Sequence, residues 1–289
     1  MASGSTSGVL DIGGRQVKLT TLDRVLYPSE DVTKADVITY YVTIAERMLP
    51  HLAHRLVTRI RWPQGVGGER FFEKQLPSHA PPWLARVTLQ HSDGPITYPV
   101  VSEAAALVWL AQLNGLELHV PQWRWVDDAP HTDRLVLDLD PGPGTGLAEC
   151  AVVAQWLREK LLTDGLPSVP VTSGSKGLHL YAHWDETRHG EESPSQYAKR
   201  LAEAAVSELS SLVTATMTKR VREGRVFIDW SQNNPNKTTI APYSLRGRDH
   251  PFVAAPRTWD EVATPDLAHL HYREVLERLA EPDPLASLL

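Results

Sequence analysis

The sequence RLVLDLDPG, from Arg134 to Gly142, is an apolar run that ends in two carboxylates and a Pro-Gly pair. The apolar residues predict a buried strand, and the Pro-Gly pair predicts the turn that ends it. Because alternate side chains of a strand point the same way, Asp138 and Asp140 share one face. Two like charges held this close are unfavourable without a cation, and Mg²⁺ or Mn²⁺ prefers oxygen ligands. The pattern favours a metal site over the alternative, aspartates at a solvent-exposed strand end.

A third carboxylate stands in a similar context. Asp229 ends the apolar run VFID, which begins at Val226. Three carboxylates at strand ends could build a two-metal site for in-line phosphoryl displacement. Whether Asp229 meets the other two aspartates is a question for the structure.

Two further segments are rich in hydrogen-bond donors. The first, SGSKGLHLY from Ser173 to Tyr181, is a Gly-rich turn between two expected strands, and its serines and lysine suit phosphate oxygens. Its spacing is not that of a P-loop. The second runs from Asp229 to Arg248, and its arginine forks suit bidentate phosphate binding. The alternative for this second segment is an ordinary polar surface loop.

Phe71 and Phe72 lie among the basic residues Arg61, Arg70 and Lys74. An exposed aromatic pair can stack on nucleic-acid bases of any sequence. Because neighbouring residues of a strand point to opposite faces, we expect at least one of these phenylalanines to belong to the core.

The composition of the 289-residue chain, 42% hydrophobic and 22% charged, is that of a globular protein and excludes disordered, collagen-like and coiled-coil classes. The one cysteine excludes an internal disulfide and a cysteine-based zinc site. The net charge of −6 argues against a polyanion partner. However, residues 214–248 carry seven lysines and arginines against two acidic residues, so one face could still bind nucleic acid.

No apolar run reaches the ~20 residues of a membrane span, and the N-terminus has no signal-peptide pattern. We therefore expect a cytoplasmic protein with no membrane partner. Periodicity predicts helices at 34–52, 102–113, 147–162 and 193–209, interspersed with short strands. The expected fold is α+β, with a flexible tail at residues 1–8 and a single domain over residues 9–289.

Several motifs, in this order, resemble one family: LDLDP at 137–141, SGSKGLHLY at 173–181, DWSQN at 229–233 and KTTIAPYSLR at 237–246. The chain is similar, from about Val17 to Arg257, to the polymerase domain of bacterial DNA ligase D and its stand-alone relatives. These belong to the archaeo-eukaryotic primase superfamily. The shorter motifs VLYP at 25–28, FFEKQ at 71–75 and HVPQW at 119–123 extend the resemblance.

The resemblance implies a primase-polymerase catalytic fold, with mainly antiparallel sheets flanked by helices. It implies that Asp138, Asp140 and Asp229 are catalytic and hold two Mn²⁺ or Mg²⁺ ions. The residues implied around an incoming NTP or dNTP are His119, Ser173, Lys176, His179, Arg222, Gln232, Lys237, Arg246 and Arg248. Those expected to bind DNA are Arg24 and Lys34 at a 5′-phosphate, Phe71 and Phe72 at the template, and Arg61 of the basic cluster.

These observations predict a template-directed nucleotidyltransferase that fills short gaps during DNA break or excision repair. The resemblance further implies acceptance of ribonucleotides, often in preference to deoxyribonucleotides. The expected partners are gapped or broken DNA with a 5′-phosphate, a separate ATP-dependent DNA ligase and the end-binding protein Ku, in the bacterial nucleoid. A chain of this length has no room for ligase or nuclease modules, so we expect another chain to seal the break unless this is an excised domain.

One departure from the family pattern concerns Ile60, which stands between Arg59 and Arg61 where some relatives carry a basic residue. It predicts weaker or different binding of DNA ends. Two alternatives remain: a non-catalytic module that bridges DNA ends, and a D-x-D glycosyltransferase that binds a nucleotide sugar through Mn²⁺.

Overall fold

The computed structural model describes residues 6–189 and 192–289, and it divides into two compact units. Unit 1 comprises residues 1–120, 240–253 and 271–280, and unit 2 comprises residues 121–239, 254–270 and 281–289. Most of the expected tail, residues 1–5, lies outside the described residues, and the first strand already begins at Gly8. The expectation of a single domain over residues 9–289 stays a prediction.

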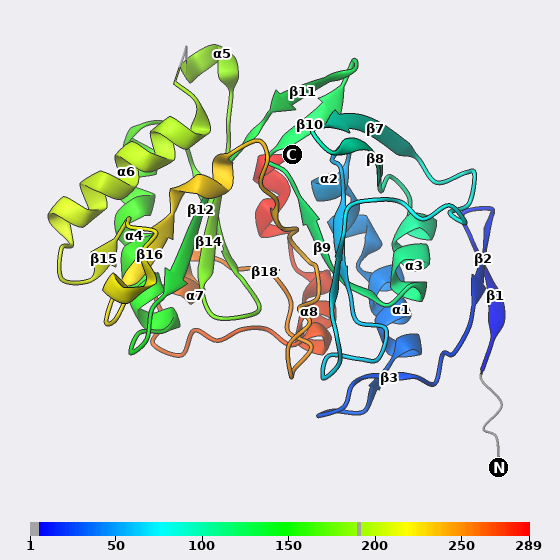
Figure 1. The fold of residues 1–289 in the computed structure, drawn as a ribbon. Coiled ribbons are helices and arrows are strands. Elements are labelled where there is room, and N and C mark those ends of the chain that lie inside the picture. Colours follow the sequence, from blue (N-terminus) through cyan, green and yellow to red (C-terminus); the bar gives the residue numbers. More distant parts are fainter. Residues whose placement is uncertain (1–5, 190–191) are drawn as a thin grey trace. The chain divides into compact units, whose positions relative to one another are not determined.

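A six-stranded sheet forms the centre of unit 2, in the order β15-β16-β12-β14-β13-β18 (Figure 1). Neighbouring strands are antiparallel except β15 and β16, which are parallel. The strands are β12 (Arg134–Pro141), β13 (Ser168–Thr172), β14 (Leu178–His183), β15 (Val213–Thr214), β16 (Val226–Asp229) and β18 (Ala255–Pro256). A separate hairpin pairs β10 (Trp123–Val126) with β11 (Ala129–Thr132).

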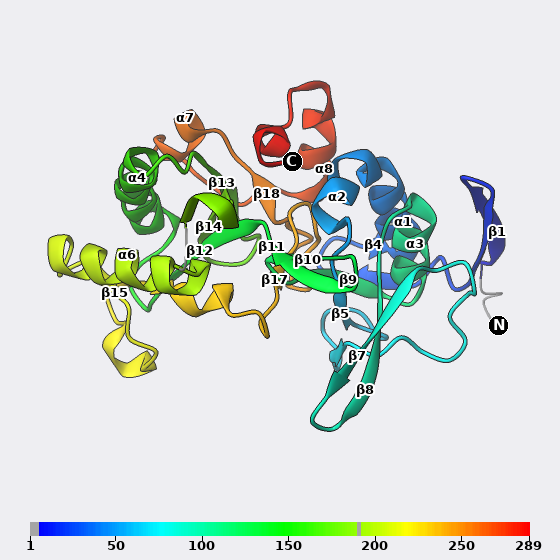
Figure 2. The same ribbon diagram turned by 90° about the horizontal axis from the view of Figure 1, so that it is seen from above.

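Two long helices, α4 (Leu147–Thr163) and α6 (Pro194–Glu208), pack on this sheet (Figure 2). Ser193 caps α6, with Pro194 in the first turn, as its sequence predicts. Leu135, Leu137 and Leu139 of β12 share one buried apolar cluster with residues of both helices. The apolar half of each strand therefore anchors the sheet to the helices. The shorter helices of the unit are α5 (Glu186–His189) and α7 (Trp259–Val262).

Unit 1 combines a second sheet with helices and hairpins. The sheet has the order β17-β9-β5-β6, made by β5 (Thr58–Arg61), β6 (Phe71–Glu73), β9 (Gly115–Val120) and β17 (Thr239–Ile240), where the chain enters this unit. The hairpins are β1 (Gly8–Ile12) with β2 (Arg15–Leu19), β3 (Val25–Tyr27) with β4 (Val32–Thr33), and β7 (Arg86–His91) with β8 (Gly94–Pro99). The helices are α1 (Lys34–Thr43), α2 (Ala45–Leu52), α3 (Ala104–Gln112) and α8 (Tyr272–Glu277).

The helix expected over residues 34–52 is divided into α1 and α2 at Ile44. Its start agrees with the sequence, because Thr33 and Asp36 form a reciprocal capping box. Just before the break, the hydroxyl groups of Thr39 and Thr43 each donate to the carbonyl four residues earlier, a bond that tends to bend helices.

The fold is mixed α+β with mainly antiparallel sheets, as the sequence predicts. No helix among residues 6–189 and 192–289 is long and apolar enough to cross a membrane.

Candidate active site

Strand alternation brings four polar side chains to one face of the six-stranded sheet. Leu139, Leu178 and Ile228 point into the apolar cluster beneath α4 and α6. The residues next to them in each strand, Asp138, Asp140, His179 and Asp229, consequently point to the opposite face. The sheet turns its apolar side to the helices, and the opposite side, which carries these four residues, is called the carboxylate face below.

Strand register then sets these residues side by side. Asp138 lies directly opposite Asp229 on β16 and directly opposite His179 on β14. Side chains at such positions have Cβ atoms about 4.5–5.5 Å apart. The question that the sequence left open is therefore answered: Asp229 lies beside Asp138, and Asp140 lies one step further along the same face.

Hydrogen bonds link the two buried aspartates. The Gln232 amide nitrogen donates to Asp229 Oδ2 at 3.1 Å and to Asp138 Oδ2 at 3.3 Å. Nε2 of His179 lies 3.3 Å from Asp138 Oδ1, and Nζ of Lys237 lies 3.7 Å from Asp229 Oδ2. The structure therefore brings three of the predicted nucleotide-binding residues onto the aspartates themselves.

Asp140 differs from its two neighbours, because no side-chain hydrogen bond or ion pair is described for it. Asp140 is an exposed residue, yet the protein atoms around its carboxyl group disfavour the charged form. This desolvation and the charges of Asp138 and Asp229 together raise its pKa to about 6, against the opposing effects of His179 and Arg222. At Asp140 the charges of the other two aspartates therefore add to desolvation in disfavouring ionisation.

The donor set suits a divalent cation, since its oxygens come from carboxylates that repel one another. Among residues 6–189 and 192–289, however, no three His, Cys, Asp or Glu side chains already converge as a metal cage. In particular, Gln232 bridges Asp138 and Asp229, so binding an ion there would require this amide to move. The residues fit the ions chemically, and they are adjacent rather than preassembled.

The SGSKG turn is built around Ser173. Its hydroxyl accepts hydrogen bonds from the backbone N–H groups of Ser175, Lys176 and Gly177 at 3.1–3.3 Å. A Cβ on Gly177 would lie 2.0 Å from the carbonyl oxygen of Leu139, so only glycine permits this approach to β12. Ser173 thus shapes the turn, while the Lys176 side chain is exposed to solvent.

The backbone of Arg222 lies against Gly142, where a Cβ would meet the Arg222 carbonyl oxygen. The guanidinium carbon of Arg222 is 3.6 Å from the centre of the Phe227 ring. Nη2 of the same group donates to the carbonyl of Met217 at 2.8 Å. Its charge also lowers the pKa of Asp140, although it does not outweigh the opposing effects. Arg222 is thus near the carboxylate face, as the resemblance implies.

The other predicted nucleotide-binding residues, His119, Arg246 and Arg248, lie in unit 1. Nε2 of His119 is 2.8 Å from Oε2 of Glu117, and Nη1 of Arg246 is 3.5 Å from the same oxygen. The N–H of Gly247 donates to the other oxygen, Oε1, at 3.0 Å. The side chain of Arg248 is exposed.

Glu117 is almost fully buried at 4% exposure. Burial by itself would raise its pKa. The His119 hydrogen bond, the Arg246 and His119 charges and the Gly247 N–H outweigh burial and lower the pKa to about 2. The carboxylate is therefore ionised and surrounded by donors.

Three basic residues gather at another place in unit 1. Lys34 is 3% exposed and donates to the carbonyl of Thr20 at 2.9 Å. Burial, followed by the charges of Arg24 and Arg61, lowers its pKa to about 8. Arg24, Lys34 and Arg61, which we call the basic triad, are thus close enough for the two arginines to repel the Lys34 ammonium, while Nη1 of Arg61 also pairs with Oε1 of Glu73 at 2.7 Å.

The expectation that one phenylalanine of the pair belongs to the core is wrong. Phe71 is 41% exposed and Phe72 is 58% exposed. They lie on β6, the three-residue outer strand of its sheet. Both rings are thus exposed.

Sequence reasoning missed Glu117, Ser231 and Gly247. Ser231 donates to Asp229 from its backbone and its hydroxyl, and Lys237 in turn donates to that hydroxyl. A Cβ on Gly247 would lie 2.2 Å from the Trp62 ring. The one available signal was the ELH spacing, because alternate strand residues Glu117 and His119 share a face.

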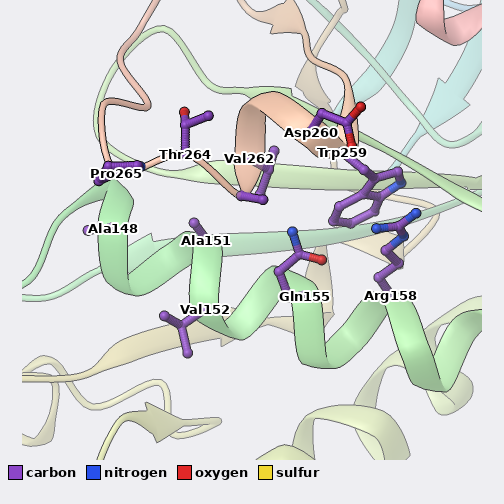
Figure 3. A pocket seen from close by; sticks show the side chains of 11 residues that line it. Ala148, Ala151, Val152, Gln155, Arg158, Trp259, Asp260, Val262, Thr264 and Pro265 are labelled. Atoms are coloured by element: carbon purple, nitrogen blue, oxygen red, sulfur yellow. The ribbon is translucent and has the colours of Figure 1, made fainter.

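A cavity of about 580 Å³ in unit 2 is separate from these groups. It lies between α4 and the segment from Trp259 to Pro265, with Val152 and Trp259 among its walls (Figure 3). It contains none of the predicted site residues.

Aspartates on adjoining antiparallel strands of an α+β fold are the arrangement expected of a primase-polymerase domain. The family described as "LigD, primase-polymerase domain" matches residues 33–285. The chain belongs to this family.

Known proteins agree with this assignment. The chain is 53% identical over 275 residues to the multifunctional non-homologous end joining protein LigD of Mycolicibacterium smegmatis, which covers 95% of this chain and 36% of that protein. It is 32% identical to the bifunctional LigD of Bacillus subtilis, over 86% of this chain and 39% of that protein. The chain thus spans little more than a third of these relatives.

Among solved structures, the polymerase domain of Mycobacterium tuberculosis Ligase D, determined in complex with DNA, matches with a TM-score of 0.89 and 52% identity. The match covers 94% of this chain and 97% of that one.

Proposed function

We propose that this chain is a template-directed nucleotidyltransferase that extends a DNA 3′-hydroxyl across a short gap or a processed break end. The observation that carries the proposal is the carboxylate face of unit 2, where Asp138 and Asp229 are adjacent and the pKa of Asp140 is raised to about 6. A polymerase needs concentrated negative charge that divalent cations can neutralise.

The chemistry is a phosphoryl displacement. The primer 3′-oxygen forms a bond to the α-phosphorus of the nucleotide, the bond from that phosphorus to the β-phosphate oxygen breaks, and pyrophosphate and the hydroxyl proton leave. Mn²⁺ or Mg²⁺ ions, when bound by Asp138, Asp140 and Asp229, would supply charge stabilisation for the attacking and leaving oxygens.

The remaining polar residues of this face act around those carboxylates. His179 and Gln232 orient Asp138 through the contacts described, and Lys237 is placed beside Asp229. Lys176 and Arg222 offer positive charge to phosphate oxygens. In unit 1, His119, Arg246 and Arg248 are the proposed nucleotide contacts.

Support for DNA as the substrate comes from unit 1. The repulsion that Arg24 and Arg61 exert on Lys34 would be relieved by a bound 5′-phosphate, which would add to the charge that Glu73 supplies to Arg61. The exposed rings of Phe71 and Phe72 suit unpaired template bases, where stacking contributes about 1–3 kcal/mol per base. We further propose that ribonucleotides are accepted and that a separate ATP-dependent ligase and Ku act on the same DNA ends.

Primer extension on a short gapped duplex tests this proposal. The duplex carries a recessed 5′-phosphate, Mn²⁺ is supplied, and each NTP is compared with its dNTP. We expect templated addition that is faster with the 5′-phosphate than with a 5′-hydroxyl.

Asp138→Ala is expected to remove addition without weakening DNA binding, and the exposed Asp266→Ala serves as a matched control that leaves both unchanged. Wild-type protein that binds the duplex but adds no nucleotide with either metal would refute the proposal and indicate a module that bridges DNA ends.

A further inference from the structure

Glu117 has a surrounding unlike that of any aspartate on the carboxylate face. It lies on β9, which its neighbours β5 and β17 flank, and it is almost completely buried. Its two oxygens accept hydrogen bonds from Nε2 of His119 and the N–H of Gly247, and Nη1 of Arg246 forms an ion pair with it at 3.5 Å. Two of these groups are proposed nucleotide contacts, and the third is the residue that follows Arg246.

Besides the bond from the Gly247 N–H to Glu117, two other bonds hold the backbone of Arg246. The Tyr27 hydroxyl donates to the carbonyl of Arg246 at 2.8 Å, and the N–H of Arg246 donates to the carbonyl of Phe252 at 2.9 Å. What these bonds leave undetermined is the direction of the guanidinium group. Its described polar contact is the one with Glu117, and its buried Nε has no hydrogen-bond partner within the described part of the chain.

The same carboxylate determines the state of the His119 ring. An ionised carboxylate can only accept hydrogen bonds, so the nitrogen 2.8 Å away must carry a proton. The Nε2–H form is thereby selected, and Nδ1 is the ring nitrogen left for other partners.

We infer that Glu117 is a positioning residue for nucleotide binding, which aligns the His119 ring and the Arg246 guanidinium through one shared carboxylate. This inference rests on the proposed function for its consequence, because the two aligned groups are the proposed nucleotide contacts of unit 1. Glu117 itself remains buried and touches no substrate.

Glu117→Gln is the sharpest test, because it keeps the shape of the side chain and removes its charge. The amide offers one acceptor oxygen to the two hydrogen-bond donors, loses the ion pair with Arg246, and turns its NH₂ group toward one of the donors. We expect KM for the nucleotide in the gap-filling reaction to rise about 10- to 100-fold, in line with the loss of other orienting partners. The Kd for gapped DNA, measured without nucleotide, should not change.

A spectroscopic readout separates positioning from simple structural support. In ¹⁵N NMR of the imidazole rings, His119 of the wild-type protein should be protonated at Nε2, and Glu117→Gln should shift the proton toward Nδ1. Glu46→Gln, at an exposed glutamate of the same unit, is the matched control and should alter neither the ring nor KM.

If Glu117→Gln does not fold, Glu117→Asp takes its place. It keeps the charge on a shorter side chain, so Nε2–H should persist while KM rises. An unchanged KM in a folded variant, or a wild-type ring without a proton at Nε2, would overturn the inference. Wild-type protein that adds no nucleotide would instead refute the proposed function, and the NMR result would still decide whether Glu117 selects the ring form.

Discussion

Glu117 and Asp140 are both acidic residues of strands, and the protein shifts their pKa values in opposite directions. The pKa of Glu117 falls to about 2 because a histidine, an arginine and a backbone N–H face it. The pKa of Asp140 rises to about 6 because water is displaced and two further carboxylates face it. Burial opposes ionisation in both cases, so the neighbours decide the outcome.

The opposite pKa shifts show that the protein supplies Glu117 with positive partners and supplies Asp140 with fewer. Glu117 already has its positive partners within unit 1, and the result is a fixed arrangement of side chains. Asp140 and its neighbouring aspartates lack enough positive charge within unit 2. A carboxylate cluster that the fold leaves under-neutralised is a candidate for an external cation, which Glu117 is not.

Neutralising Asp140 is expected to produce the largest effect. Asp140→Asn removes one of the repelling charges, so the metal-free protein should become more stable toward urea at pH 7. Under the proposed function, activity in primer extension should fall on the order of 10³-fold, because the carboxylate proposed to hold a metal ion would contribute several kcal/mol to catalysis.

Asp140→Asn is thus expected to raise stability and to lower activity, and this opposition is what the experiment tests. Ser231→Ala, which alters a neighbour of Asp229 and leaves all three carboxylates in place, is the comparison variant. A variant Asp140→Asn that loses stability or keeps its activity would contradict the assignment of an under-neutralised site.

Acid should destabilise the protein through Glu117. Its folded pKa of about 2 lies below its usual value of 4.5, so its stabilising contribution is complete above pH 4.5 and is lost as the pH falls toward 2. The shift corresponds to about 3 kcal/mol, of which about 2 kcal/mol is lost between pH 5 and pH 3.

Urea unfolding of the wild type and of Glu117→Gln at each pH measures this contribution. The difference in unfolding free energy between the two proteins should shrink as the pH falls. A difference that stays constant from pH 5 to pH 3 would show that Glu117 does not have this low pKa.

Much of this could be predicted from the sequence where periodicity acts locally. The alternation in LDLD placed Asp138 and Asp140 on one face, and Ser193-Pro194 marked the start of α6. Glu117 was missed because its partners Arg246 and Gly247 are distant in sequence, and their convergence depends on strand pairing. The exposure of both phenylalanines likewise depends on tertiary packing, which the local sequence does not show.

Gly247 tests how tightly the Glu117 arrangement is packed. A Cβ at this position would lie 2.2 Å from the buried ring of Trp62, so Gly247→Ala must displace the N–H that donates to Glu117. Overpacking of this kind costs about 1–3 kcal/mol. Thermal unfolding should show the loss, and Gly67→Ala, where a Cβ meets nothing within 4 Å, should not. Equal stability of the two variants would refute the close packing.

The basic triad should give the smallest effect. Burial and the charges of Arg24 and Arg61 lower the pKa of Lys34 to about 8, so Lys34 loses its proton as the pH rises from 7 to 9. A 5′-phosphate is fully ionised across that range. Affinity for 5′-phosphorylated DNA should therefore fall by up to about tenfold as Lys34 becomes neutral, and a 5′-hydroxyl duplex should show no such change.

Lys34→Arg separates the charge of Lys34 from its titration. Arginine remains protonated at pH 9, so the variant should bind 5′-phosphorylated DNA equally well at both pH values. The free energy of unfolding depends on the same titration with the opposite sign. The unfolded chain keeps its lysine proton up to about pH 10.5, whereas folded Lys34 loses it near pH 8. The free energy of unfolding of the wild type should therefore rise between pH 8 and pH 10.5. A wild-type affinity for 5′-phosphorylated DNA that does not change between pH 7 and pH 9 would mean that the phosphate is bound without the charge of Lys34.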